Sequence, residues 1–350
     1  MEPIKRFLRS TIAGPIFAFL AVAAVVALTT PRFLHVQNLS NVSLQVSIVA
    51  IVAIGGTLVI LTGGIDLSPG ATVALVCVSL AHLVRKMGVP LPTAIALVIV
   101  LGMVLGLLNG LLSTYGKIPS FIVTLATMNV YRGAAYLITK ALTIFSVSPL
   151  LEPIFYGRLL GIPMPFYYVV ILYGVAALFL RYTVPGRFLY AVGGNESAAL
   201  LSGIPVNRVK LMAFVLAGLT AAIAGVLETA WLNSGSPAYG QELALGNIAA
   251  AVIGGASLAG GSGNMFATLF GALTVAVVQN GLNLHAVQAA WQDITLGVVL
   301  VLAVGLDMWR GALGKLLGRL VLRRSLARPE AAPRGPSARR EDGRTNEGLE

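Results

Sequence analysis

The sequence has few of the residues that enzymes use for chemistry. Only 11% of its 350 residues are charged, and it contains three histidines and one cysteine. Cys77 has no second cysteine to pair with, so an intrachain disulfide is excluded. The histidines are far apart and lack metal-ligand spacing, and no combination of nucleophile, base and metal ligands suggests an active site. The sequence therefore predicts neither a metal site nor a catalytic site.

Hydrophobic residues are abundant instead: they make up 57% of the chain, and its mean hydropathy is +0.87. Apolar runs of about 17 to 22 residues recur, each long enough to cross roughly 30 Å of hydrocarbon as a helix. We therefore expect an all-α polytopic membrane protein with one transmembrane domain, residues 1–309, and some helices broken or interrupted by glycine. About ten transmembrane helices are predicted, at residues 14–30, 42–62, 67–85, 91–113, 118–139, 165–181, 211–232, 243–257, 263–284 and 290–308.

The formal net charge of +11 comes from basic residues in the short links and the C-terminal tail, so it indicates membrane topology and no nucleic-acid partner. With both termini in the cytoplasm, most basic residues fall on the inner side, and Arg85 and Lys86 are the main exceptions. The tail, residues 310–350, has few large apolar residues and is expected to be a disordered cytoplasmic segment. A long outer link, residues 140–165, is expected to form short irregular or helical pieces.

The long inner link, residues 182–210, contains a short predicted helix whose two ends are marked in the sequence. Asn195 can accept hydrogen bonds from the first free amides, and Glu196 complements the positive end of the helix dipole. Gly203 suits the left-handed position after the last turn, and Pro205 prevents continuation of the helix.

A helix of about two turns is not stable alone in water, so it must pack on another structure. One possibility is a capped turn that rests on the protein's own bundle at the membrane surface. The other is a knob that inserts into a cytoplasmic motor protein. The residues of the helix by themselves leave both possibilities open.

Five segments have distinctive sequences. They are GGIDLSPG at residues 63–70, FIVTLATM at 121–128, YAVGGNESAALLSGI at 190–204, GGASLAGGSG at 254–263 and NGLNL at 280–284. In this order they resemble the sugar-type permeases of ABC importers, the family of the ribose, xylose and galactose importers. Pro69 stands where members of that family often carry Val. The resemblance covers roughly residues 40–308.

The resemblance implies a pore-forming permease subunit of a monosaccharide importer in a bacterial-type inner membrane. Its partners would be membrane lipid, a second copy of the chain or a close paralogue, two cytoplasmic ABC ATPase domains, and a periplasmic or lipid-anchored sugar-binding protein. The sequence contains no G-x-x-x-x-G-K-[ST] phosphate loop, so the chain is expected to bind no cofactor and to be no enzyme by itself; the partner ATPase would use ATP and Mg²⁺. The coupling-helix residues would be Gly194, Asn195, Glu196, Ala198, Ala199, Ser202 and Gly203.

Asp66 follows the second predicted span, where a carboxylate is costly in hydrocarbon. It would either cap the third helix at its N-terminus or take a direct part in gating. The glycines around it permit a break in the helix, and residues 254–261 repeat their spacing, which indicates either two related half-bundles or a chance match. The candidate gating or pathway residues are Gly63, Gly64, Asp66, Ser68, Gly254, Gly255 and Asn280.

Other polar residues lie within or beside the spans. They are Arg132, Glu228, Asn280, Asn283 and Asp293. Such residues could contact sugar hydroxyls or form interhelical hydrogen bonds, and Arg132 could pair with Glu228. The spacing Gly102-x-x-x-Gly106 favours close helix packing over a role in lining a pore.

Two other functions remain open. An ion-coupled secondary transporter would need membrane-embedded carboxylates, which Asp66, Glu228 and Asp293 could supply, but it would have no motor for a coupling helix to engage. An ABC permease for branched-chain amino acids or nucleosides would share the broad fold. The run GIDLS at residues 64–68 favours a sugar over these solutes by its resemblance.

Overall fold

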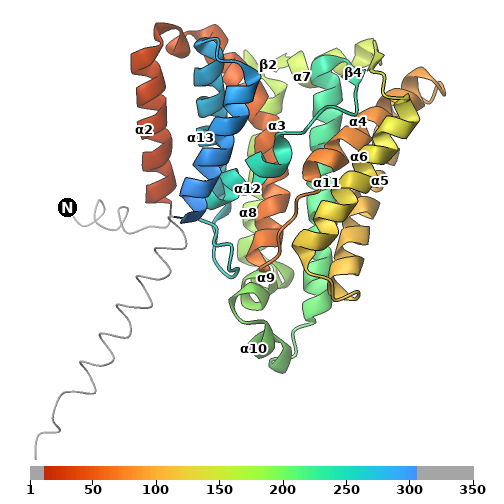
Figure 1. Ribbon diagram of the computed structural model, residues 1–350, viewed down its shortest axis with the longest axis vertical. Helices are drawn as coiled ribbons and strands as arrows, with labels where there is room; N and C mark the ends of the chain where they lie inside the picture. Colours follow the sequence, from red (N-terminus) through yellow and green to blue (C-terminus); the bar gives the residue numbers. More distant parts are fainter. Residues whose placement is uncertain (1–11, 306–350) are drawn as a thin grey trace, which may run out of the picture. The chain divides into compact units, whose positions relative to one another are not determined.

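The computed structural model describes residues 12–305 and shows a bundle of helices that run in alternating directions (Figure 1). The helices of the bundle are α2 (Ala13–Thr29), α3 (Val36–Leu61), α4 (Pro69–Arg85), α5 (Leu91–Thr114), α6 (Ser120–Thr139), α8 (Met164–Tyr182), α11 (Val206–Leu232), α12 (Leu243–Ile253), α13 (Met265–Leu284) and a last helix, Ala289–Gly305. Each lies on a predicted span. The all-α polytopic class is confirmed.

Six of these helices are long and apolar enough to cross a membrane by length and composition: α3, α5, α6, α8, α11 and α13. The other four apolar helices are shorter. Among them α12 has 11 residues, a length of about 16 Å, and ends at Ile253, where the sequence predicted a span to residue 257. The total of ten crossings therefore stays a prediction.

The outer link consists of short pieces, as expected. They are β1 (Ile144–Phe145), η2 (Pro149–Leu151), α7 (Glu152–Tyr156), β2 (Arg158–Leu159) and β3 (Ile162–Pro163). A further turn, η1 (Pro31–Leu34), joins α2 to α3 at the same end of the bundle (Figure 1). Strand β1 pairs antiparallel with β4 (Ser234–Gly235), which fixes the link to the chain that follows α11.

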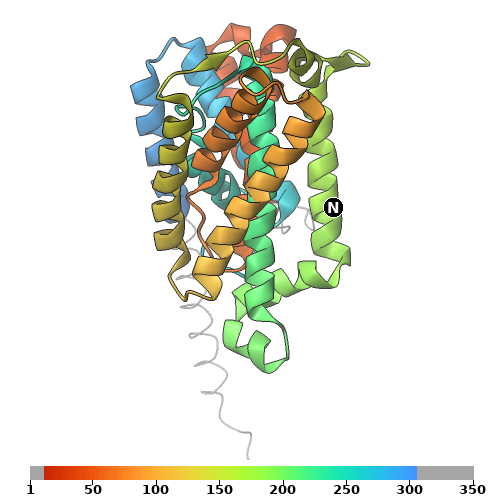
Figure 2. The ribbon, with the colours of Figure 1, turned by 90° about the vertical axis from the view of Figure 1, so that its right-hand side faces the viewer.

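The opposite end carries two short helices, α9 (Val184–Gly194) and α10 (Glu196–Leu201), which lie beyond the bundle (Figures 1 and 2). The sequence predicted α10 but not α9. The signals for α9 are Thr183, whose hydroxyl accepts a hydrogen bond from the Gly186 amide at 3.1 Å, and a proline in the first turn. Helix α2 begins, and the helix Ala289–Gly305 ends, on the side of α9 and α10 (Figure 1). The predicted tail, residues 310–350, lies outside the described residues.

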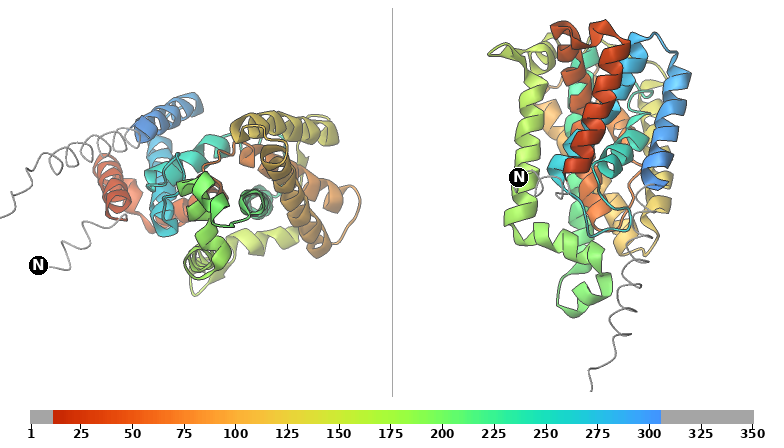
Figure 3. Two further views of the ribbon diagram at one scale, coloured as in Figure 1. Left: turned by 90° about the horizontal axis from the view of Figure 1, so that it is seen from below. Right: turned by 90° about the vertical axis from the view of Figure 1, so that its left-hand side faces the viewer.

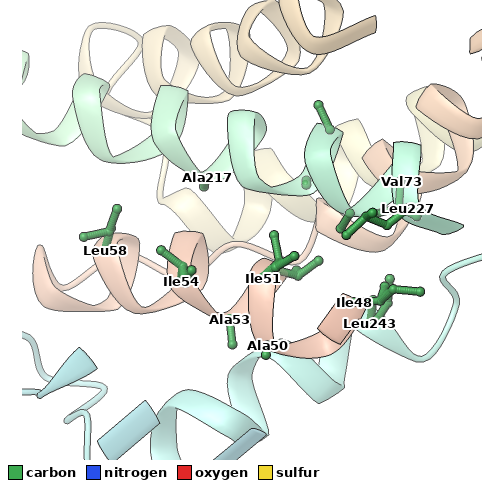
Figure 4. Close-up of a cluster of buried hydrophobic side chains, with 14 of the residues drawn as sticks. Ile48, Ala50, Ile51, Ala53, Ile54, Leu58, Val73, Ala217, Leu227 and Leu243 are labelled. Atoms are coloured by element: carbon green, nitrogen blue, oxygen red, sulfur yellow. The ribbon is translucent and has the colours of Figure 1, made fainter. Parts of the chain in front are cut away.

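Helices α3 and α11 form the centre of the bundle. Helix α3 is almost completely buried from Val46 to Leu61 and packs against α8, α11, α12 and α13. Figure 4 shows Ile51 and Ile54 of α3 directed toward α11, while Ala50 and Ala53 face α12. Seen from below, α11 is viewed nearly end-on in the middle of the bundle (Figure 3).

The predicted close packing at Gly102 and Gly106 is confirmed, and the partner is α11. A Cβ atom on Gly102 would lie 2.6 Å from the carbonyl oxygen of Gly218, and one on Gly106 would lie 2.2 Å from that of Phe214. Only glycine at these positions lets α5 approach the α11 backbone so closely. This contact holds the α4–α6 side of the bundle against its centre.

Candidate functional site at the inner end of the bundle

Helix α10 has the two caps that the sequence predicts. The Asn195 side chain accepts a hydrogen bond from the Ala198 amide at 2.9 Å. At the other end Gly203 has a φ of +77°, and the Ile204 amide donates to the Ala199 carbonyl at 3.0 Å. This is the left-handed closure that favours glycine. Local residues alone therefore determine where α10 begins and ends.

Glu196, in the first turn of α10, also makes an ion pair that the sequence did not predict. Its carboxylate lies 2.7 Å from the Lys210 ammonium group on α11, and the two side chains are 58% and 25% exposed. The pair ties α10 to the start of the central helix α11. A displacement of α10 would therefore act directly on α11.

Two large apolar side chains lie on the exposed surface of α10. Leu200 is 65% exposed and Leu201 is 89% exposed, while Ala199 is the buried residue of the helix. Among the described residues nothing covers these two leucines. Large apolar side chains at the tip of a segment outside the bundle are typical of a surface that another protein covers.

A junction of glycines lies where α9 meets the bundle. A Cβ atom on Gly193 would lie 1.8 Å from the carbonyl oxygen of Leu61 and 2.5 Å from the amide nitrogen of Gly261. That Gly261 amide donates a hydrogen bond to the same Leu61 carbonyl at 3.0 Å. The end of α9, the end of α3 and the loop after α12 therefore touch through their backbones.

Two further contacts complete this glycine junction, which we define as Leu61, Gly63, Gly193, Gly260 and Gly261. A Cβ on Gly260 would lie 2.8 Å from the Gly63 amide nitrogen and 2.9 Å from the Gly193 carbonyl oxygen. Gly63, Gly260 and Gly261 all have φ values between +72° and +87°, which L side chains rarely adopt. Three of the five distinctive sequence segments thus meet at one point.

Tyr190 of α9 adds a side-chain contact to the same place. Its hydroxyl donates to the Gly263 carbonyl at 3.1 Å. Burial raises the pKa of the Tyr190 phenol, so the group remains a neutral donor at physiological pH. Helix α9 is therefore held to the α12–α13 loop by both backbone and side chain.

Asp66 and Ser68 belong to a buried hydrogen-bond network in the break between α3 and α4. The Asp66 carboxylate accepts hydrogen bonds from the Ser68 amide at 2.8 Å and the Ser68 hydroxyl at 2.7 Å. The Asn109 side chain of α5 donates to the Ser68 hydroxyl at 2.8 Å, and the Tyr131 hydroxyl of α6 lies 3.1 Å from the Asn109 carbonyl oxygen. Asp66 does not bond amides of the first turn of α4, so the prediction that it caps this helix is wrong; Pro69 has no amide to offer there.

The same break is fixed to α6 at its backbone. The Ser120 hydroxyl accepts a hydrogen bond from the Ile65 amide at 3.0 Å, and the Thr124 hydroxyl lies 3.3 Å from the Ile65 carbonyl oxygen. A cavity of about 480 Å³ opens beside it at the inner end. Its polar lining includes Thr62, Lys117, Ser120, Glu196, Asn207 and Lys210.

The other predicted pathway residues lie elsewhere. Gly254 packs on the α13 backbone at Thr268, and Gly255 has a φ of +83°. Asn280 is buried on α13 and exchanges two hydrogen bonds of 3.0 Å with the Asn38 side chain on α3, which is an interhelical contact. The two glycine blocks differ locally in their backbone: Gly255 is left-handed and the corresponding Gly64 is not.

Arg132 and Glu228 do not pair. The Arg132 guanidinium donates to the Pro237 carbonyl at 3.0 Å, and within residues 12–305 the Lys210–Glu196 pair is the salt bridge that forms. Of the remaining polar residues, Asp293 is exposed, and Asn283 accepts a hydrogen bond from Gln292 at 2.7 Å. Asn247 of α12 was not among the predicted polar residues; its buried amide lies against Gly56 of α3 and has no hydrogen-bond partner among the described residues.

Comparison with known proteins identifies the family. A family model described as "Branched-chain amino acid transport system / permease component" matches residues 38–304. The ribose import permease protein of Bacillus subtilis is 43% identical over 301 residues, which is 85% of this chain and 93% of that protein. No solved structure matches the chain.

Two further relatives carry other sugar names. The xylose transport system permease protein of Haemophilus influenzae is 35% identical and covers 83% of this chain and 93% of its own length. The D-allose transport system permease protein of Escherichia coli is 33% identical, with 84% and 90% covered. The chain therefore belongs to this permease family: it is a sugar-type ABC transporter permease, a multi-pass protein of the inner membrane.

Proposed function

We propose that this chain forms the translocation pathway of an ABC importer for a monosaccharide. As a member of its family it is a transport subunit without ATPase activity of its own and works within a complex of several subunits. The names of its relatives, which are permeases for ribose, xylose and allose, favour a pentose or hexose over a branched-chain amino acid or a nucleoside.

The glycine junction is the observation that carries the proposed mechanism. A movement of α9 and α10 would displace Gly193, and the backbone contacts would pass that displacement to α3 through Leu61 and to the α12–α13 loop through Gly261. Backbone segments in direct contact have no flexible side chains between them to absorb the motion. The coupling residues Gly194, Asn195 and Glu196, which follow Gly193 directly, would receive the movement from the ATPase and pass it to Gly193.

The topology that we propose places α9 and α10 in the cytoplasm. Basic residues lie before α2, at positions 5, 6 and 9, and in the tail after residue 310. Helix α2 begins and the helix Ala289–Gly305 ends on the side of α9 and α10. Since cytoplasmic segments retain basic residues, both termini and the coupling helices would be cytoplasmic, which agrees with ten crossings.

The partners follow from this topology. Leu200 and Leu201 would dock on one of two ABC ATPase subunits, which would bind the ATP and Mg²⁺. A second copy of this chain or a close paralogue would complete the pore, and an extracytoplasmic binding protein would deliver the sugar. Residues 310–350, which lie outside the described residues, would be a cytoplasmic tail of the single transmembrane domain.

Replacement of residues 196–202 by a flexible linker tests the docking. We expect the ATPase subunit to be lost from the purified complex while the permease still inserts into the membrane. A milder pair of variants isolates the apolar tip: Leu201→Ser should weaken ATPase binding, whereas Leu160→Ser, at an equally exposed leucine on the outer link, should not. Equal binding by both variants would contradict the proposed docking surface.

Reconstituted transport tests the function itself. Proteoliposomes with the complete complex should take up a monosaccharide only with ATP inside. Uptake by this chain alone, driven by a proton or sodium gradient, would instead identify an ion-coupled secondary transporter. Competition with unlabelled ribose, xylose, allose, leucine and a nucleoside would separate the sugar proposal from the branched-chain amino acid and nucleoside alternatives.

A further inference from the structure

The chain between α11 and α12 is not helical, and its last residues carry polar side chains on the surface. Residues 233–242 form this break. Gln241 and Glu242 are exposed, and Glu242 at the start of α12 makes no side-chain cap to the helix. The Gln241 amide and the Glu242 carboxylate are therefore exposed, and the carboxylate does not cap α12.

The break reaches deep into the bundle. Gly240 touches Gly70 at the start of α4, where a Cβ on Gly70 would lie 2.1 Å from the Gly240 carbonyl oxygen. Helix α4 then runs from Gly70 to its outer end at Arg85, a distance of about 22 Å at 1.5 Å per residue. Glu242 therefore lies inside the roughly 30 Å of hydrocarbon and far from its outer surface.

Neither Glu242 nor the open backbone around it can face lipid at this depth. An ionised carboxylate is costly inside hydrocarbon, so it faces water or protein instead. Non-helical backbone at membrane depth is found only where it is buried in protein or lines a water-filled cavity. The exposed side of the break must therefore be wet or covered by another subunit.

A second carboxylate and a cation border the same break. Glu228 lies one turn before the end of α11, where the break begins, is buried, and has no hydrogen bond or ion pair among residues 12–305. The Arg132 guanidinium is attached to the break through the Pro237 carbonyl. An apolar partner surface would leave these groups unpaired, whereas hydroxyl groups could donate to the carboxylates and accept from the guanidinium.

We infer that the break between α11 and α12, with Gln241, Glu242 and Glu228, is a contact site for a polyhydroxylated solute on its way through the membrane, on a face closed by a second copy of this chain. This inference rests on the proposed function and names the place where its substrate would bind. Together with the inner cavity at Thr62 and Lys117, it places polar groups at two successive depths of the bundle.

Cysteine labelling of the complete importer in proteoliposomes tests the inference. The parent variant is Cys77→Ala, which removes the one natural thiol. Gln241→Cys and Glu242→Cys report on the break, and Ile171→Cys, 59% exposed in the middle of α8, is the lipid-facing control. We expect a charged, membrane-impermeant thiol reagent to label Gln241→Cys and Glu242→Cys but not Ile171→Cys.

Protection by sugar provides the second readout. With D-ribose, D-xylose or D-allose as the probe, whichever the parent transports, labelling of Gln241→Cys should slow about tenfold at a sugar concentration ten times its Kd. Failure of the charged reagent at both break positions while an apolar maleimide labels them would overturn the inference, and so would labelling that no transported sugar slows. Loss of uptake in the parent would count against the proposed function only, because the charged reagent still reports whether the break is wet.

Discussion

Gly193 of α9 and Leu61 of α3 are in contact through their backbones, so closely that a single added carbon on Gly193 would lie 1.8 Å from the Leu61 carbonyl oxygen. Because neither partner is a flexible side chain, the contact can be lost only if one of the two segments moves. It is therefore the most sensitive point of the proposed path from the coupling helices to the pore.

Gly193→Ala should destabilise the protein and uncouple it. Overpacking of this kind costs about 1–3 kcal/mol, and here the obstacle is backbone on both sides. The control is Gly174→Ala in α8, away from the coupling helices, whose new Cβ would also meet nothing within 4 Å. Thermal unfolding of the purified permease and sugar uptake per ATP hydrolysed measure both effects, and equal behaviour of the two variants would contradict the role of the junction.

Asp66→Asn should leave the stability of the protein nearly unchanged, whereas Asp66→Ala should lower it. The Asn carbonyl oxygen can still accept from the Ser68 amide and hydroxyl, while alanine leaves these buried donors unpaired at a cost of about 1–3 kcal/mol. Melting temperatures of the two variants decide whether Asp66 acts as a hydrogen-bond acceptor. If Asp66→Asn is stable but does not transport, its charge has a separate part in gating.

The ion pair of Glu196 and Lys210 should add little to stability. Exposed pairs contribute about 0.2–1 kcal/mol and weaken with salt. Glu196→Gln and Lys210→Met should therefore unfold almost like the parent at high ionic strength but lower sugar-stimulated ATPase activity of the complex. The charge-swapped double variant, Glu196→Lys with Lys210→Glu, should recover coupling; its failure to do so would show that the pair is not what ties α10 to α11.

Asn247→Leu should maintain or raise stability. Its buried amide has no partner among the described residues, and such a group costs about 1–3 kcal/mol that an apolar residue of similar size avoids. Thr57→Val, one residue from Gly56, is the opposite case, because it leaves the Thr268 hydroxyl without its 3.1 Å partner and should lower stability. A destabilised Asn247→Leu would indicate that the amide is satisfied by a group that the described residues do not include.

Features that local interactions determine were predictable from the sequence. The ends of α10 depend on Asn195 and Gly203, each of which acts within a few residues. The apolar runs placed each helix of the bundle, with the largest errors at the starts of α3 and α11. The extra turns at the start of α3 and α11 were missed because they are polar enough to lie outside an apolar run.

Contacts between distant segments could not be predicted in the same way. The glycines of the junction stood out in the sequence, but no local pattern indicates that Gly193 contacts Leu61. The two residues come together only when the bundle packs. Asn280 likewise binds Asn38 on another helix. Arg132 binds the Pro237 carbonyl group and not the Glu228 carboxylate that the sequence suggested as its partner. Pairings of this kind depend on tertiary packing, and the identity of one partner does not determine the other.

The burial of α3 has a consequence for how the protein is made. This helix emerges from the ribosome early, and α8 covers part of it, yet the covering surfaces on α11, α12 and α13 are synthesised after residue 205. Until then lipid must surround its apolar sides, which is tolerable because every backbone group of a helix is satisfied internally. Lipid must later leave this surface as the C-terminal helices arrive, so nascent chains that end before Val206 should insert their first helices but remain unassembled.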